Sequence, residues 1–192
     1  ASAQADFIYT VSQDLAKLPG INLPMFWVQW FSSCPTADGT DPLAVAPAIN
    51  SATATDLTDI TQWSAGGYNK STAGSLGGTT GGSPNDASLI RGMQYLQERG
   101  YEIGFAPMVL GEYSASAGST PELVWRGDFS FSTTQKCQTW MNSYITFVQW
   151  YIDLFSANGI NLARTTVGSE FENFTVNAPA AQWAIISAAL QS

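Results

Sequence analysis

The amino-acid sequence predicts an α/β fold in which helices cover a parallel β-sheet. Helical and strand patterns alternate along the 192 residues, as they do in consecutive βα units. The strand candidates are nearly continuous apolar runs, which are typical of parallel strands buried on both faces. The segments that follow strands are long, whereas those that follow helices are only a few residues. This asymmetry is typical of barrel folds, whose sites are built from loops at the carboxyl ends of the strands.

The first half of the chain combines one apolar strand with a long polar segment. Phe7 to Gly20 has helical spacing and ends at a Pro-Gly stop signal. Ile21 to Phe31 is dense in apolar and aromatic residues and is predicted to form a buried strand. Residues 32–83 are rich in Gly, Ser, Thr and Asp, with a possible short strand at Ile60 to Asn69. A polar stretch of this length is either a plain linker or a functional loop.

A capped helix opens the second half. Ser83 is the expected N-cap, Pro84 fits the first turn, and Asp86 completes a capping-box-like pattern, while Gly100 ends the helix. The remaining elements alternate in the same way. They are a strand at Tyr101 to Leu110, a loop at 111–136, a helix at Cys137 to Gly159, a strand at Ile160 to Gly168 and a helix at Ala178 to Leu190. The chain, 1–192, is therefore expected to be a single region with long strand-exit loops at 32–83 and 111–136.

Composition excludes several classes of function. Only seven Lys and Arg residues are scattered along a chain of net charge −8, which argues against binding nucleic acid or an anionic membrane. No apolar run is long enough to span a membrane. The absence of histidine excludes Ser-His-Asp and Cys-His catalysis and His-based zinc sites within this chain. No metal or other cofactor is expected. Cys34 and Cys137 could form a disulfide or remain buried thiols. Both ends of the chain are expected to be cuts from a larger polypeptide or products of processing.

Acidic residues follow two of the predicted strands. Glu112 comes after one strand, and Glu170 and Glu172 come after the next. The loop between them carries Trp125, Arg126 and Asp128. Glycoside hydrolysis needs one carboxylic acid to protonate the leaving oxygen and one carboxylate to act as nucleophile or base. An aromatic ring can stack on a sugar, and an arginine can hold a carboxylate or clamp a ligand. The simpler alternative is that these acids are only solvated and that Arg126 pairs with Asp128 or Glu112.

Five motifs give the chain a family resemblance. They are VQWF at Val28 to Phe31, WSAGGYNKSTA at Trp63 to Ala73, GGSPNDASLIRGMQYLQERG at Gly81 to Gly100, VWRGDFS at Val124 to Ser130 and VGSEFENFT at Val167 to Thr175. In these motifs the sequence resembles the TIM-barrel-like, glycoside-hydrolase-type domain of tail-tip hub proteins from gene transfer agents and tailed phages. The resemblance runs from about Leu15 to about Leu190 and covers the first half of that domain.

The resemblance implies specific roles. Glu170 falls at the place of the general acid/base of barrel hydrolases, Trp125 and Arg126 match a Trp-Arg-Gly motif, and Glu112 falls where the family has an acid after a strand. The family's later YAADWSEY-like segment and the nucleophile after strand seven have no counterpart here, so half of the carboxylate pair is absent. Catalysis is therefore expected to involve Glu170 and Glu112, and substrate binding Trp125, Arg126, Asp128 and Glu172.

Two functions follow from these expectations. The first is a structural virion protein at a phage or phage-like tail tip or baseplate, with a half barrel that binds or cleaves host envelope glycans. Its expected partners are other tail subunits or the remainder of the parent polypeptide, because an open half barrel leaves sheet edges unpaired. The alternative is an active glycoside hydrolase on a cell-wall or surface polysaccharide, with Glu170 as general acid/base. The expected location is the virion tail tip, or alternatively the extracellular space.

Overall fold

A four-stranded sheet forms the centre of the computed structural model, which describes residues 13–50, 63–69, 71–76, 82–116 and 121–173 and positions 184, 187 and 188. Strand β6 lies in the middle and pairs with β1 in parallel along one edge. Along its other edge β6 pairs with β8 in parallel at residues 103–105 and with the short β7 in antiparallel fashion at residues 111–113. The strands are β1 (Met25–Cys34), β6 (Ile103–Tyr113), β7 (Glu122–Val124) and β8 (Leu162–Thr165).

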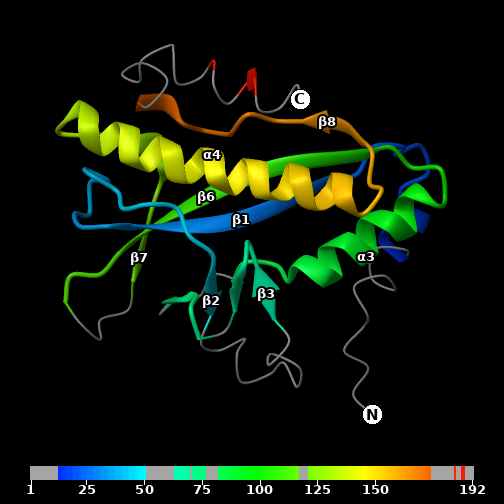
Figure 1. Ribbon diagram of the computed structural model, residues 1–192, viewed down its shortest axis with the longest axis horizontal. Helices are drawn as coiled ribbons and strands as arrows, with labels where there is room; N and C mark the ends of the chain where they lie inside the picture. The colour runs from blue at the N-terminus through cyan, green and yellow to red at the C-terminus, as the bar shows by residue number, and fades with distance from the viewer. Residues whose placement is uncertain are drawn as a thin grey trace.

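Two helices connect the parallel strands, and both contribute to one core (Figure 1). Helix α3 (Asp86–Gln97) lies between β1 and β6 in the sequence, and α4 (Thr134–Ala157) lies between β6 and β8. The longer helix buries one stripe of mostly aromatic side chains, next to which Leu154 is half-buried. The fully buried members of this stripe include Trp140, Tyr144, Phe147, Val148 and Tyr151. The order β1–α3–β6–α4–β8 is thus a parallel α/β arrangement, as the sequence predicted.

The two faces of the sheet have different environments. On β1 the even-numbered residues, such as Val28 and Trp30, are buried beneath the helices. Trp27 belongs to the alternate, odd-numbered set and its side chain is 59% exposed. The prediction that both faces of the sheet are covered is therefore confirmed for residues 103–107 of β6, which are all buried, and wrong for part of β1. On β1 the face away from the helices is open at Trp27 and Ser33, whereas Phe31 is buried.

The long polar segment after β1 contains local structure. Strand β2 (Ala48–Asn50) pairs in parallel with β5 (Gly74–Leu76), and β3 (Ser64–Ala65) forms a two-residue hairpin with β4 (Tyr68–Asn69). The short strand predicted within residues 60–69 is this hairpin, and it does not join the main sheet. The same segment also pairs with the outer edge of β1, since Phe31 and Ala46 exchange backbone hydrogen bonds of 2.8 and 2.9 Å. The described main sheet thus has three parallel strands, not the four βα units expected for a half barrel.

The start of α3 differs from the predicted cap. Asn85, not Ser83, is the N-cap: its backbone is extended and its side chain accepts a 2.9 Å hydrogen bond from the backbone N–H of Ala87. The Oγ of Ser83 instead accepts from the N–H of Ala48, so it ties the helix start to β2. Gly100 ends the helical segment with a φ of 82°, as predicted.

The other boundaries differ by a few residues. Strand β1 begins at Met25, not Ile21, and β6 runs to Tyr113, beyond the predicted end at Leu110. The predicted loop at 111–136 contains β7 and a 3-10 helix, η2 (Arg126–Asp128). Of the helix predicted at the N-terminus, residues 13–16 are helical and residues 7–12 lie outside the described range; the C-terminal helix also lies outside it, apart from helical positions 184, 187 and 188.

Candidate functional site

The predicted site residues lie on three segments that follow strands. Glu112 is the second-last residue of β6, whereas Trp125 follows β7 directly. Arg126 and Asp128 begin and end η2. Glu170 and Glu172 follow β8, with Glu172 in a short helical turn. Because β6 and β8 are parallel neighbours, the segments that follow them leave the same end of the sheet.

Three of these residues meet directly. The indole Nε1 of Trp125 donates a 3.0 Å hydrogen bond to Oε2 of Glu170. The guanidinium Nη2 of Arg126 forms a 2.9 Å ion pair with the same oxygen. The side chain of Arg126 is 8% exposed and that of Glu170 is 52% exposed, so a buried cation supports a carboxylate that solvent can reach. Since the contacts from Trp125 and Arg126 both use Oε2, we take Oε1 as the oxygen that a ligand would engage.

The backbone before Glu170 is fixed by α4. The hydroxyl of Tyr144 donates a 2.9 Å hydrogen bond to the carbonyl of Val167. Phe171 is buried and packs edge-on against the rings of Trp140 and Tyr144. Arg126 adds a third anchor, because its Nε donates a 2.7 Å hydrogen bond to the carbonyl of Ser169. Burial raises the pKa of Tyr144, which keeps this hydroxyl a hydrogen-bond donor at neutral pH.

The other three predicted residues have different positions. Glu112 is half-buried on β6, in register with Ser33 of β1 and Leu123 of β7. It shares the strand-exit end with Glu170. Asp128 and Glu172 are exposed. The structure therefore joins Trp125, Arg126 and Glu170 into one contact cluster and puts Glu112 at the same end of the sheet.

Sequence reasoning missed the burial of one acid, Asp86. Asp86, in the first turn of α3, is buried and accepts hydrogen bonds from Tyr151 Oη at 3.0 Å, from the Gly66 N–H at 3.0 Å and from Trp150 Nε1 at 3.3 Å. Burial raises its pKa despite these donors. Its sequence neighbours suggested only a capping role. A polar residue such as Asp86 gives no sign of burial in the sequence. The groups that surround it come from the β3–β4 turn and from α4, which are distant in the sequence.

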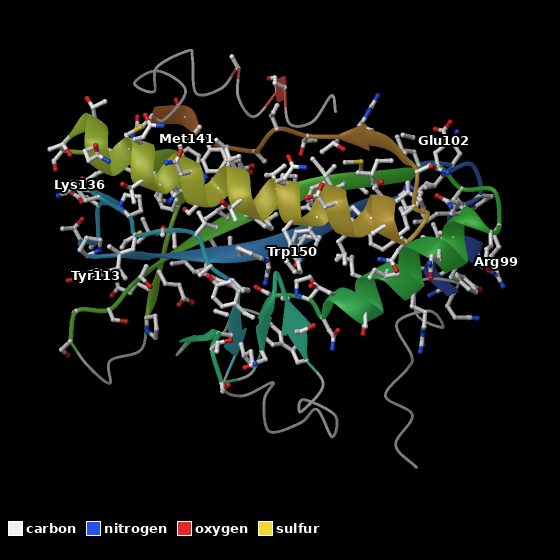
Figure 2. All side chains as sticks on the ribbon, in the orientation of Figure 1. Arg99, Glu102, Tyr113, Lys136, Met141 and Trp150 are labelled. Carbon is white, nitrogen blue, oxygen red and sulfur yellow. The ribbon has the colours of Figure 1, made fainter. Side chains whose placement is uncertain are left out.

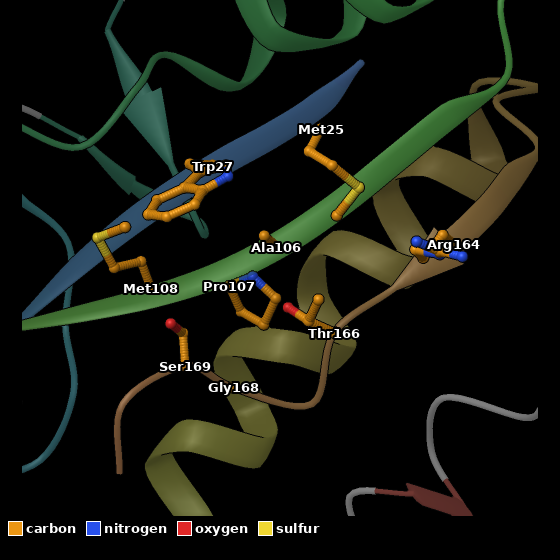
Figure 3. Close-up of a pocket in the computed structure, with 9 residues that line it drawn as sticks. All are labelled: Met25, Trp27, Ala106, Pro107, Met108, Arg164, Thr166, Gly168 and Ser169. Atoms are coloured by element: carbon orange, nitrogen blue, oxygen red, sulfur yellow. The ribbon is translucent and has the colours of Figure 1, made fainter. Parts of the chain in front are cut away.

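Sequence reasoning also missed a cavity on the open face of the sheet. It has a volume of about 330 Å³ and lies between β1, β6 and the segment after β8 (Figure 3). Its lining residues include Trp27 from β1, Met108 from β6 and Arg164 from β8. Ser169, which directly precedes Glu170 in the sequence, also lines the cavity. The sequence contained one signal for it, the alternation of side chains along a strand. Because successive side chains of β1 point to opposite faces, Trp27 points away from the face on which Phe26 and Val28 are buried.

Other kinds of site find no support among the described residues. No group of three or more His, Cys, Asp or Glu side chains there is arranged to hold a metal ion. Nor does that part of the chain contain a helix of the length and apolar character needed to cross a bilayer. Cys34 and Cys137 are buried, no disulfide joins them, and burial raises the pKa of Cys34 to about 11.

The fold and the site together define a parallel α/β protein with a Trp–Arg–Glu cluster where two strands exit. No known family and no curated protein sequence matches the chain. Among solved structures, a GH113 beta-1,4-mannanase complex is similar at 15% identity and a TM-score of 0.45. That match covers 86% of this chain and 40% of the mannanase chain. The chain thus spans about two-fifths of the mannanase's length, and a likeness at this level assigns it neither a family nor an activity.

Proposed function

We propose that this chain is a glycan-binding domain whose site is the cluster of Trp125, Arg126 and Glu170. The observation that carries the proposal is the double contact on Glu170 Oε2, which fixes a solvent-accessible carboxylate beside an indole that is 46% exposed. A fixed carboxylate accepts hydrogen bonds from sugar hydroxyls, and an exposed aromatic ring packs against the apolar face of a sugar. Such a pair of groups suits a sugar unit that offers hydroxyl groups and no charge at this position.

We place this domain in the tail tip or baseplate of a phage or phage-like particle. The support is the order and spacing of the five sequence motifs that resemble tail-tip hub proteins. In such a particle, other tail subunits or the rest of a parent polypeptide would pack against the edges of the sheet, and the ligand would be an envelope glycan of the host. The cluster at the strand exits would then face the cell surface.

The binding proposal is tested with three variants and an oligosaccharide array. Glu170→Gln keeps the shape of the side chain but removes its charge, and Trp125→Ala removes the ring. Each is expected to weaken binding at least tenfold, since each removes a charge-assisted hydrogen bond or a stacking surface. Glu98→Gln, at the exposed C-cap of α3, is the matched control and is expected to bind like the unmodified chain. Unchanged binding by both site variants would contradict the proposal.

A second candidate is an active glycoside hydrolase. The observation in its favour is that Glu112 and Glu170 exit neighbouring parallel strands at one end of the sheet. In this mechanism one carboxyl group protonates the glycosidic oxygen and the other attacks the anomeric carbon or activates water. Release of reducing ends by the unmodified chain, lost in both Glu112→Gln and Glu170→Gln, would establish the hydrolase. Binding without release of reducing ends would favour the glycan-binding domain.

A further inference from the structure

The open face of the sheet contains an aromatic platform. Trp27 is among the most exposed of the large hydrophobic side chains in the described chain, and it lies in the wall of the 330 Å³ cavity. Met25 and Met108 line the same cavity, and their thioether chains provide adaptable apolar surface next to the ring (Figure 3). A flat exposed indole bordered by methionines favours a ligand with one apolar face, such as a sugar ring.

The same cavity contains a positive charge without a counterion. Arg164 lines it from β8, where it is in register with Gly104 of β6. Among the described residues no carboxylate pairs with Arg164, although the chain carries fifteen Asp and Glu residues against seven Lys and Arg. Arg126 and Lys136, in contrast, each have an acidic partner. Arg164 is exposed, and a guanidinium at the wall of a cavity without an acidic partner is suited to a carboxylate or sulfate group of a ligand.

Two polar residues connect this cavity with the cluster around Glu170. Thr166 lines the cavity, and its Oγ1 is buried with no hydrogen-bond partner in the described structure. A ligand hydroxyl that reaches it would satisfy a buried polar group whose isolation is costly. Ser169 also lines the cavity, and its carbonyl accepts the hydrogen bond from Arg126. Since Glu170 is the next residue, the cluster begins one residue beyond the wall of the cavity.

We propose that this cavity is an additional subsite for an acidic sugar unit, with the ring on Trp27 and the carboxylate or sulfate on Arg164. The inference rests on the proposed glycan-binding function and specifies its ligand as an anionic polysaccharide. The Trp125–Glu170 cluster then holds a neighbouring sugar through its hydroxyls, and Arg164 selects for charge. Binding at the two places is linked because one oligosaccharide spans both.

Calorimetric titration of the whole chain tests the subsite. The ligands are an oligogalacturonate, a sulfated oligosaccharide and a neutral oligosaccharide of equal length, all at one ionic strength. At least one of the anionic ligands is expected to bind at least tenfold more tightly than the neutral one. Arg164→Gln is expected to remove that preference by lowering the affinity for the anionic ligands to about that for the neutral one. Arg99→Gln, a cation that packs on Tyr95 of α3, is the matched control and should retain the preference.

The outcomes separate the two proposals. Equal affinity for anionic and neutral ligands, with loss of binding in Glu170→Gln, would overturn the acidic subsite and keep the glycan-binding function. A preference for anionic ligands that persists in Arg164→Gln would also overturn the subsite. No binding of any of the three ligands would count against both. Trp27→Ala adds a second check, since it is expected to weaken the anionic ligands severalfold while the far-ultraviolet circular dichroism spectrum stays unchanged.

Discussion

Glu170 has a backbone φ of 59°, in the left-handed region that non-glycine residues seldom occupy. Such a conformation costs roughly 1 kcal/mol or more, and it persists only where the surroundings fix it. Here the surroundings are Tyr144 on the carbonyl of Val167, Arg126 on the carbonyl of Ser169, and the buried ring of Phe171. The side chain that carries the proposed function is therefore held by residues from α4 and η2, which are distant in the sequence.

Gly127 controls the position of Trp125. A Cβ at Gly127 would lie 2.5 Å from atoms of the Trp125 ring, closer than real side chains come. Because Trp125 is partly exposed, we expect Gly127→Ala to push the indole outward and to break its hydrogen bond to Glu170. Glycan affinity should fall about tenfold, because one hydrogen bond contributes roughly 1.4 kcal/mol. The free energy of unfolding in urea should change little. Equal affinity in this variant would show that the indole position is unimportant.

Asp86 gives the protein a pH-dependent stability that can be measured. Its pKa is raised by burial, so the folded state holds this proton more tightly than the unfolded state does. Between the unfolded pKa, roughly 3.9, and the higher folded pKa, the folded state binds more protons, and stability falls as pH rises. In urea unfolding, we expect the free energy of unfolding of the unmodified chain to fall, relative to that of Asp86→Asn, as the pH rises through this window. A difference that is constant with pH would contradict the raised pKa.

At the scale of elements, helix and strand positions were predictable because each has an apolar repeat of its own. The longest helix follows its stripe of aromatic residues, and β1 and β6 follow their apolar runs. The antiparallel β7 was not predicted, since three residues that pair only with the end of β6 carry no periodic signal. The cap of α3 was misassigned because Ser83 and Asn85 both fit, and only the tertiary partner of Ser83 on β2 distinguishes them.

The corrected cap can be tested by substitution. Asn85→Ala removes the side-chain acceptor for the Ala87 N–H and is expected to lower the free energy of unfolding by about 1 kcal/mol. Asn85→Asp keeps an acceptor at this helix terminus and is expected to stay within about 0.5 kcal/mol of the unmodified chain. Thermal and urea unfolding measure both variants. If Asn85→Ala proved as stable as Asn85→Asp, the assignment of Asn85 as N-cap would be wrong.

At the scale of the whole molecule, α3 and α4 pack their side chains on one face of the sheet (Figure 2), and the other face is open at Trp27 of β1. The sequence predicted the parallel α/β class and a site at strand exits that combines Trp125, Arg126 and Glu170 with Glu112, Asp128 and Glu172. It did not predict the cavity or the Asp86 cluster, because both depend on which face each strand turns toward the helices. A nearly continuous apolar run such as β1 looks the same whether one face or both faces are buried.

The open face makes a prediction about two neighbouring residues of β1. Trp27→Gln alters an exposed side chain and is expected to change the free energy of unfolding by about 0.5 kcal/mol or less. Val28→Ala leaves a cavity beneath the helices and is expected to cost about 2 kcal/mol. Urea unfolding at one pH compares them. A cost at Trp27 as large as that at Val28 would mean that the face is covered in the folded protein.

The central claim is that Trp125 and Glu170 form one ligand site, and nuclear magnetic resonance of the indole N–H groups tests it most directly. The seven tryptophans give up to seven indole signals, and Trp125→Phe identifies the signal of interest. We predict that this signal has a different chemical shift in Glu170→Gln, which alters its hydrogen bond. We also predict that it shifts in the unmodified chain when an oligosaccharide that binds is titrated in. A Trp125 signal that is unaffected by both would contradict the site.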